Sequence, residues 1–372
     1  MKPNRLVFID VLRGIAVTWM IETHVVHIGL ASAFKSGWLY NKIYVSNGFV
    51  AVGFIFCAGA GFWLAAASEK FSSSLGPYLR RLGFILIVAY TLNLPVFSLR
   101  YTLHPTSADL LRLVNCDILH AIVFSSLLAL LIYFLVPRLD RMRLVFAGVA
   151  LLILGTTPLV WAMDPFASLP APLAALVSRP PISKFPLFPW MAYFFAGAAV
   201  TGFFMQAKNK RRFAIGLAAL AWITFYIVFF VKNLPFTYPG YNDWGYSSPG
   251  HAFYRLSGVV FVFALLYLAE EKFGASHRVN RFFQLLGQES LLLYVGHLMI
   301  IYGTVAGIGL RYYAANALTP LLTFIVTLFI TVGGYVIAKG WHDFKTNNSR
   351  RARVTLSILG SLLFILFILN PL

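Results

Sequence analysis

The first apolar segment of the chain carries side chains that could do acid–base chemistry inside a membrane. Residues 8–30 are long enough to cross a bilayer, yet they contain Asp10, Arg13, Glu22, His24 and His27. Ionisable groups are costly inside a spanning helix, so a segment that keeps this many is expected to use some of them. With about 100° of rotation per residue, Arg13 and His24 share one helix face about 16 Å apart along the axis. This segment is therefore predicted to present a cation near its start and an imidazole deep in the membrane.

Other apolar segments carry polar side chains at a similar depth. With the N-terminus in the cytoplasm, Asp117 and His120 begin a span from the outside, and Arg255 lies in the first turns of another. Tyr294 and His297 lie on one face of a later segment, near the middle of the membrane. We expect these groups to occupy the outer half and the centre of the membrane, although depth alone does not show that their faces converge.

Each of these residues also has a simpler structural explanation. A lone buried histidine is more often a hydrogen-bonded packing residue than a catalyst, which is the favoured interpretation for His120, whereas for His297 the two are balanced. For His24 the functional interpretation is favoured because its helix is unusually rich in charge. Arg80 and Arg81 could equally be cations that anchor a span at the cytoplasmic surface.

The two levels of the first segment suggest a donor with phosphates at one end and a reactive group at the other. Arginine pairs well with phosphate, so Arg13, Arg80 and Arg81 could hold such a donor at the cytoplasmic side. An extended arm about 16 Å long would then bring its far end to His24. Acyl coenzyme A has this shape, because a long pantetheine arm joins its nucleotide head to a thioester.

Several side chains could take part in acyl transfer from such a donor. His24 could take a proton from an attacking hydroxyl or amine, or could briefly accept the acyl group. Arg255 or Tyr294 could stabilise the developing oxyanion, and Asp117 or Glu22 could orient an imidazole.

The composition is that of a polytopic membrane protein. Of the 372 residues, 59% are hydrophobic and 11% are charged, whereas a soluble domain would have about a quarter charged residues. The net charge of +18 does not indicate nucleic-acid binding, because most lysines and arginines lie in short runs between apolar segments. Cys57 and Cys116 lack Cys-x-x-Cys spacing, so two packed thiols are expected rather than a disulfide framework or a metal site.

Apolar runs of about twenty residues predict about eleven spans. They are, roughly, residues 8–30, 44–67, 82–99, 118–136, 144–162, 185–205, 213–231, 252–269, 290–310, 317–338 and 354–371. Roughly twenty of the 30 lysines and arginines then fall in cytoplasmic segments and about eight in outer loops. We therefore expect an all-α polytopic membrane protein with a cytoplasmic N-terminus and a single transmembrane domain over residues 1–372. The absence of a small-residue cleavage site after the first segment favours a retained helix over a signal peptide.

Runs of sequence along most of the chain resemble one family in the same order. Residues 5–24, RLVFIDVLRGIAVTWMIETH, resemble the (D/S)xLRG(I/L)A opening of transmembrane acyltransferases. The later runs that fit are VGFIFCAGAGFWLA (52–65), PYLRRLGFIL (77–86), CDILHAIVFSSLLALL (116–131), FPLFPWMAYFFAGAAVTGFF (185–204) and LLGQESLLLYVGH (285–297). Together they are similar to bacterial relatives of the heparan-α-glucosaminide N-acetyltransferase catalytic domain. The spacing between Arg13 and His24 also resembles that of acyltransferase family 3, in the same superfamily.

The resemblance implies acyl-CoA, in the simplest case acetyl-CoA, on the cytoplasmic side of a bacterial inner membrane and an acceptor, often a sugar, on the far side. His24 would be the base or acyl carrier, and Asp10 and Arg13 would support the donor site. The candidate catalytic residues are thus His24, His297, Tyr294, Arg255, His120 and Asp117, and the candidate donor-binding residues are Asp10, Arg13, Arg80 and Arg81. Cys57 departs from the small polar residue of the family, and residues 31–43 lack the histidine and glycine-rich run of the lysosomal enzyme. That enzyme's acceptor is therefore not carried over.

Two other interpretations stay open. A transporter or flippase would use the buried histidines and arginines as a proton relay or substrate pathway, although the sequence has no internal repeat of the kind many transporters show. A structural or assembly protein would leave the charged first segment unexplained. The sequence does not reveal the acceptor, the acyl chain length or whether an ester or an amide forms. A homodimer is compatible with the sequence but is not argued by it.

Overall fold

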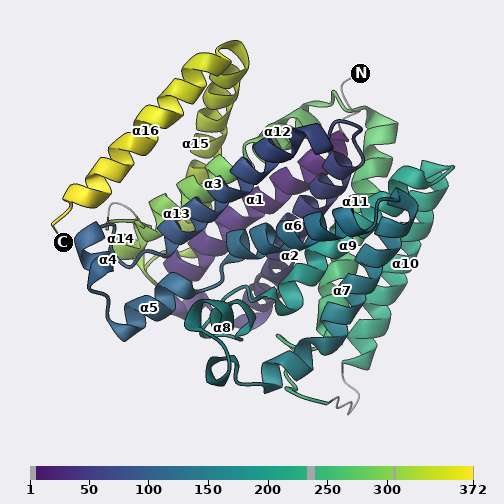
Figure 1. Ribbon diagram of the computed structural model, residues 1–372, viewed down its shortest axis with the longest axis horizontal. Coiled ribbons are helices and arrows are strands. Elements are labelled where there is room, and N and C mark those ends of the chain that lie inside the picture. Colours follow the sequence, from purple (N-terminus) through teal and green to yellow (C-terminus); the bar gives the residue numbers. More distant parts are fainter. Residues whose placement is uncertain (1–5, 233–238, 305–306, 372) are drawn as a thin grey trace.

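The protein is a bundle of helices (Figure 1), described by a computed structural model over residues 6–232, 239–304 and 307–371. Within these ranges the β structure is limited to an isolated bridge between Leu30 and Leu318. The prediction of an all-α polytopic membrane protein is confirmed. Arg5, with which the first motif begins, lies outside the described residues.

The helices fall into a long set and a short set. The long helices are α1 (Val7–Gly29), α2 (Gly37–Ala66), α3 (Leu75–Asn93), α6 (Ile118–Leu135), α7 (Leu139–Ala162), α9 (Leu187–Gln206), α10 (Lys210–Val231), α11 (Pro249–Phe273), α12 (Arg278–Gln288), α13 (Ser290–Tyr302), α15 (Pro320–Asn347) and α16 (Ser349–Leu369). The short helices are α4 (Leu99–Leu103), α5 (Ser107–Val114), α8 (Ala171–Val177) and α14 (Leu310–Ala314). In Figure 1 the short helices gather at the end of the bundle away from the N-terminus, which is the predicted extracytoplasmic end.

The number of crossings agrees with the number predicted from hydropathy. In the described part of the chain, nine helices are long and apolar enough to cross a membrane, and α12 with α13 passes the same test as one bent pair. The 23-residue α1 is not among the nine, because its ionisable side chains, which include Arg13, Glu22 and His24, lower its mean hydropathy. When α1 and the bent pair are counted with the nine, the bundle has about eleven crossings, as the apolar runs predicted.

The bent pair changes the shape of the ninth predicted span. A continuous run over 290–310 was expected, but α13 ends at Tyr302 and is only about 20 Å long. α12 supplies the rest of the crossing, and the chain turns by 73° at Glu289. The buried Glu289 carboxylate accepts hydrogen bonds from Lys345 Nζ at 2.7 and 2.9 Å and lies 2.8 Å from His342 Nδ1. Both partners belong to α15, so this ion-pair cluster ties the bend to a neighbouring helix.

Glycines bring α1 and α12 into backbone contact. A Cβ added at Gly14 would overlap the carbonyl oxygen of Phe283, and one added at Gly287 would overlap that of Asp10. Such close crossings of small residues are a common way for membrane helices to associate. The glycine of the LRG motif is therefore explained by packing, because it lets the helix with His24 lie directly against α12.

α2 and α9 cross in the same way. A Cβ at Gly59 would overlap the carbonyl oxygen of Phe194, and a Cβ at Gly197 would overlap that of Phe56. The two glycines come from separate motifs of the sequence, the second and the fifth along the chain. Together they fix the position of α2, which lies beside α1 at the centre of the bundle.

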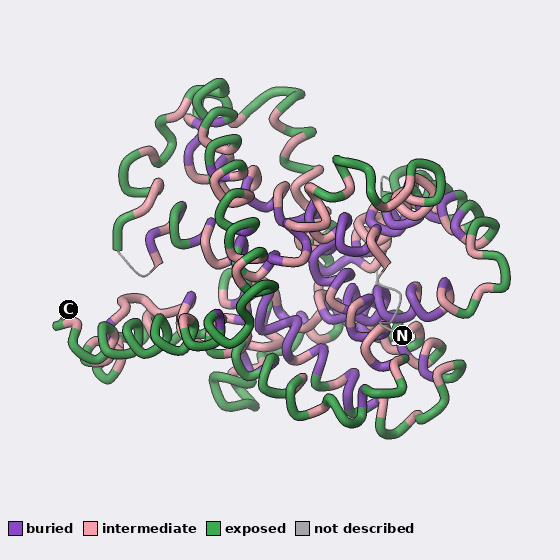
Figure 2. Tube along the Cα trace, turned by 90° about the horizontal axis from the view of Figure 1, so that it is seen from above, coloured by how far each residue is buried: buried purple, intermediate pink, exposed green. Residues whose placement is uncertain are grey.

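Burial falls from the centre of the bundle to its edge. In the apolar windows of α2 and α9, 67% and 72% of residues are buried, whereas in α10 and α16 the shares are 11% and 6%. Figure 2 shows the buried residues along the middle of the molecule and exposed residues along the hairpin of α15 and α16. The exposed side chains of α16 are mostly leucine, isoleucine and phenylalanine, as expected for a helix that faces lipid.

Candidate active site

A large cavity lies at the predicted extracytoplasmic end of the bundle. It has a volume of about 1130 Å³ and is bordered by α1, α2, α6, α11 and α13, with the short α5 and α14 near its outer side. His24, Asp117, Arg255 and Tyr294 lie on its wall, together with Tyr302. We call this space the site cavity. It joins four of the predicted catalytic residues, which the chain carries on four different helices.

His24 is held by a neighbour that the sequence analysis did not select. Its Nδ1 lies 2.8 Å from the hydroxyl of Tyr302, the last residue of α13. The rings of His24 and His297 also lie side by side, with centroids 5.2 Å apart. When His24 Nδ1 donates its proton to the tyrosine oxygen, the lone pair on Nε2 is left to act as a base or a nucleophile.

His297 has one ring nitrogen engaged and one without a partner. Its Nδ1 lies 2.8 Å from the carbonyl oxygen of Leu293. A carbonyl oxygen only accepts, so Nδ1 carries the proton and Nε2 keeps its lone pair. This Nε2 is buried and has no hydrogen-bond partner among the described residues. His297 is absent from the described lining of the site cavity, so its contact is with His24 and not with the open space.

Tyr294 and Asp117 form a second pair on the cavity wall. The Tyr294 hydroxyl donates to Asp117 Oδ2 at 3.2 Å, and Asp117 Oδ1 accepts from the backbone N–H of Ile118 at 2.7 Å. Asp117 was expected to orient an imidazole, but in the described structure its carboxylate orients a phenol instead. The Tyr294 ring stacks on Phe54, with centroids 6.0 Å apart. Tyr294 is therefore fixed both at its hydroxyl and on its ring.

Arg255 and His120 have different surroundings. Arg255 lines the site cavity and reaches α2 at Gly48, where an added Cβ would lie 3.2 Å from its Nε. It also interacts with the hydroxyl of the buried Tyr193. His120 accepts a hydrogen bond on Nδ1 from the backbone N–H of Asp117 at 3.2 Å and so helps to begin α6. His120 is buried and is absent from the described cavity lining. Its described role is therefore to cap the helix, and it does not face the open space.

The candidate donor-binding residues lie at the opposite, predicted cytoplasmic end. Arg13 donates to the carbonyl oxygen of Cys57 at 3.1 Å and lies 3.9 Å from Asp10. Arg80 and Arg81 fall in the second turn of α3, which begins at Leu75 and not near residue 82 as expected. Both side chains are exposed and form no ion pair with a described residue, and the charge of Arg81 interacts with that of Arg13. The guanidinium groups of Arg80 and Arg81 could therefore bind phosphate, whereas that of Arg13 already donates to the carbonyl oxygen of Cys57.

The site cavity is cationic. Arg112, Lys184, Arg255 and Arg311 line it, whereas Asp117 is the one carboxylate in its described lining. Among the described residues, no group of three or more His, Cys, Asp or Glu side chains could hold a metal ion. The arrangement therefore offers bases, phenols and fixed positive charge to whatever enters.

Two features of the site escaped the sequence analysis. Tyr302 lies two turns after Tyr294 on the same face, so the spacing of i and i+8 was a signal that could have found it. The glycine crossings were harder to predict, because a glycine in an apolar helix does not show which helix it packs against.

The family model described as heparan-alpha-glucosaminide N-acetyltransferase, catalytic, matches residues 5–238, more than half of the chain. The chain belongs to this family. A comparison of the chain with curated proteins found no match.

Membership makes this chain a multi-pass protein of a membrane acetyltransferase family. The matched range includes α1 with His24 and Arg13, the start of α3, and Asp117 at the start of α6. Arg255 and Tyr294 lie beyond it, as do His297 and Tyr302. The acetyltransferase match therefore includes His24 and Asp117 on the cavity wall, whereas α13, whose Tyr302 and His297 contact His24, comes from the unmatched part of the chain.

Proposed function

We propose that this protein takes an acetyl group from acyl coenzyme A at its predicted cytoplasmic end and transfers it to a hydroxyl or amine of a sugar-type acceptor in the site cavity. The single observation that carries the proposal is the place of His24. Its imidazole lies on the cavity wall, held at Nδ1 by Tyr302 and flanked by His297. The same helix carries Arg13 about three turns away and Asp10 about four turns away.

The chemistry asked of His24 is proton transfer or brief acyl carriage. A bond forms between the thioester carbonyl carbon and the acceptor oxygen or nitrogen, and the carbon–sulfur bond breaks. The proton leaves the acceptor for His24 Nε2 and passes to the departing thiolate, which leaves as a free thiol. In the two-step alternative, Nε2 first attacks the carbonyl and holds the acetyl group until the acceptor takes it.

Arg255 and Tyr294 support the charge that develops on the carbonyl oxygen. Both line the site cavity with His24, and Arg255 has several N–H donors, whereas Tyr294 has one proton, which it donates to Asp117 and would have to turn toward the oxyanion. Asp117 holds the Tyr294 hydroxyl in place, and Tyr302 does the same for the imidazole. Donors that are already positioned when the charge appears, as Arg255 would be, cost the least reorganisation.

Arg80 and Arg81 are the residues that would hold the phosphates of the donor, with Arg13 and Asp10 at the inner start of the path. None of these four lies in the described lining of the site cavity. The cavity reaches inward as far as Met20, about 10 Å short of Arg13 along the helix axis. Phe54, packed on Tyr294, lies about one turn of α2 outward from Cys57, the partner of Arg13. We infer that transfer uses a second conformation in which a passage opens past this aromatic pair.

The bend between α12 and α13 favours an alternative function, which is transport across the membrane. Broken helices are a feature of transporters, where they occur in corresponding positions of repeated halves. In the described part of the chain there is one bent pair, and the matched family is one of acetyltransferases. Transport of a small or lipid-linked substrate is therefore the second candidate.

The test uses purified protein in sealed proteoliposomes of known orientation. Radiolabelled acetyl-CoA is placed on the side of the N-terminus and glucosamine or an alkyl glucoside on the other. We expect acetylated acceptor, and none when the donor is placed on the acceptor side. Movement of the acceptor across the membrane without any acetyl donor would instead favour transport. The same assay in membranes of bacterial cells tests the proposed location in the inner membrane.

A further inference from the structure

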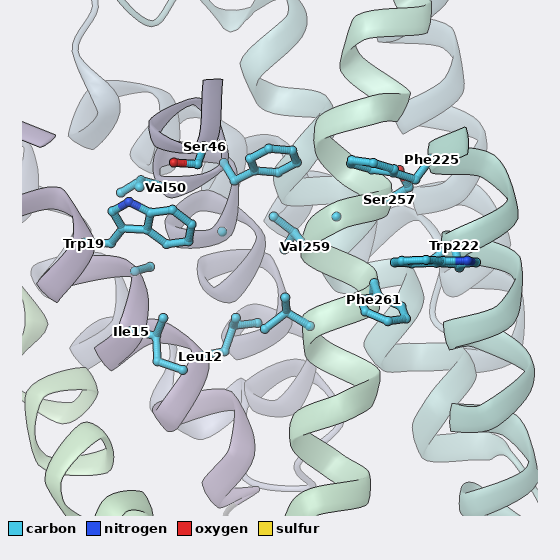
Figure 3. A pocket seen from close by; sticks show the side chains of 16 residues that line it. Leu12, Ile15, Trp19, Ser46, Val50, Trp222, Phe225, Ser257, Val259 and Phe261 are labelled. Carbon is cyan, nitrogen blue, oxygen red and sulfur yellow. The ribbon is translucent and has the colours of Figure 1, made fainter. Parts of the chain in front are cut away.

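A second cavity lies beside the site cavity and has the opposite chemistry. It has a volume of about 310 Å³ and lies between α1, α2, α10 and α11. Figure 3 shows Ile15 and Trp19 of α1 on one side of it and Trp222 and Phe225 of α10 on the other, with Val259 of α11 between them. We call it the apolar pocket. The walls are formed by apolar side chains from four membrane-spanning helices, at the depth of the lipid chains.

The few polar atoms at the apolar pocket are already satisfied. The Ser46 hydroxyl donates to the carbonyl oxygen of Ile43 at 2.8 Å, and the Ser257 hydroxyl donates to that of Tyr254 at 2.9 Å. Both bonds stay within the serine's own helix. A pocket lined almost entirely by apolar atoms favours hydrocarbon over polar ligands.

The wall between the two cavities is one side chain thick. Val50 lines both of them. Trp19, in the apolar pocket, donates from Nε1 to Oδ1 of Asn47, which lines the site cavity, at 2.9 Å. Trp19 precedes His24 by about 7.5 Å along α1, so the apolar pocket lies deeper in the membrane than the imidazole. An amphiphile with its head at His24 would have its chain at this depth.

The cations of the site cavity point to a phosphate on that head. Few lysines and arginines fall in the predicted outer segments, yet Arg112, Lys184 and Arg311 all line the site cavity, and Arg255 joins them. Cations gathered on the side that usually has few of them require an explanation by binding. Guanidinium groups pair with phosphate through short, charge-assisted hydrogen bonds.

From these two observations, and resting on the proposed function, we propose that the acceptor is a lipid-linked sugar phosphate. Its hydrocarbon chain lies in the apolar pocket, its phosphate lies among Arg112, Lys184 and Arg311, and its sugar presents a hydroxyl or amine to His24. Val45, which is half exposed, lines the site cavity one residue before Ser46, so the link between head and chain runs over the outer surface of α2.

The experiment separates the chain from the phosphate. Four synthetic acceptors share one sugar: a methyl glycoside, a dodecyl glycoside, a sugar linked through phosphate to methyl, and one linked through phosphate to dodecyl. We expect kcat/KM to rise about tenfold with the chain and about tenfold with the phosphate, as one good contact of each kind would give. The acceptor with both should be the best. Equal kcat/KM for all four would overturn the proposal while leaving acetyl transfer intact.

Variants of the two recognition elements should remove the two effects independently. Ile15→Trp fills the apolar pocket and should abolish only the gain in kcat/KM from the hydrocarbon chain. Gly53→Leu fills the same pocket from α2, because a Cβ at Gly53 meets only Ala16 and Val259 at ordinary contact distances. Arg311→Gln should abolish the gain from the phosphate only. Ile223→Trp is the matched control, because Ile223 is a lipid-facing residue of α10 with 54% of its surface exposed.

A binding measurement keeps the proposal distinct from the proposed function. A dodecyl-phosphate sugar with a diazirine on its chain is photolysed with the His24→Ala protein, and the labelled peptides are mapped by mass spectrometry. We expect label on α1 and α10 at the apolar pocket, displaced by the unlabelled compound, even if no acetyl transfer is ever detected. Label from a diazirine phosphatidylcholine that the compound does not displace would show a bulk-lipid site and overturn the proposal.

Discussion

The site cavity and the apolar pocket share three helices, α1, α2 and α11, and differ in almost everything else. The residues of α2 that face the site cavity include Asn47, Gly48 and Ala51, and those that face the apolar pocket include Phe49 and Gly53. The first space collects histidine, tyrosine, arginine and a carboxylate, whereas the second collects apolar side chains. One helix can therefore divide a polar reaction space from a hydrocarbon space, and the position of α2 decides the chemistry on both sides.

The largest effect should come from removing the imidazole of the polar space. His24→Ala should lower kcat for acetyl transfer about a thousandfold, because a positioned base or acyl carrier contributes roughly that much. Product formation by mass spectrometry measures it. His104→Ala is the control, since that side chain is exposed at the end of α4 and is absent from the described cavity lining. Full activity in His24→Ala protein that folds normally would contradict the proposed mechanism.

The next effect tests what holds the dividing helix. Gly197→Ala should destabilise the protein by about 2 kcal/mol or more, because the new methyl group would overlap the backbone of Phe56 in α2. Both cavities should then be disturbed, with a lower melting temperature in nanodiscs. Gly148→Ala in α7 is the matched control, since a Cβ there meets nothing within 4 Å, and it should be neutral or slightly stabilising. Equal melting temperatures for the two variants would show that the crossing does not fix α2.

A smaller effect is expected from the tyrosine that holds the imidazole. Tyr302→Phe removes the hydrogen bond to His24 Nδ1 and leaves the ring. We expect kcat/KM to fall about fivefold, which corresponds to the roughly 1 kcal/mol that such a bond contributes. Tyr312→Phe, on a side chain that is 74% exposed, should change nothing. An unchanged pH–rate profile and rate in Tyr302→Phe would mean that His24 is oriented by other contacts.

The sequence predicted the crossings and the first residues of the site but not how they meet. Hydropathy and the placement of cations were enough for the helices, because a bilayer imposes the length of each span. His24 and Tyr294 could be selected since ionisable or polar groups are rare at such depth. Tyr302 was missed although its spacing from Tyr294 was a signal, because its contact with His24 depends on how α13, beyond the 73° bend, packs beside α1. At the bend, Glu289 pairs with Lys345 of another helix, and local sequence does not contain that contact either.

The smallest effect concerns the outer rim of the polar space, where α5 contributes Arg112. Asp109 caps α5, and hydrogen bonds from Thr106 lower the pKa of its carboxyl below the ordinary value. A carboxyl whose pKa is lower in the folded protein adds stability above its unfolded pKa and loses it only as the pH falls through the folded pKa. Between pH values of about 5 and 8 this group therefore stays ionised, and the cap of α5 should not change.

Hydrogen exchange of residues 107–114 should accordingly be the same, after correction for intrinsic rates, across that pH range. Asp109→Asn should speed the exchange of these residues and leave that of α13 unchanged, because Asp109 accepts its hydrogen bonds from Thr106 and Tyr101, which are close to it in the sequence. A change in the exchange of α13 in this variant would show that the rim and the reaction centre move together. The polar space would then be one cooperative unit, unlike the apolar pocket, whose walls come from membrane-spanning helices alone.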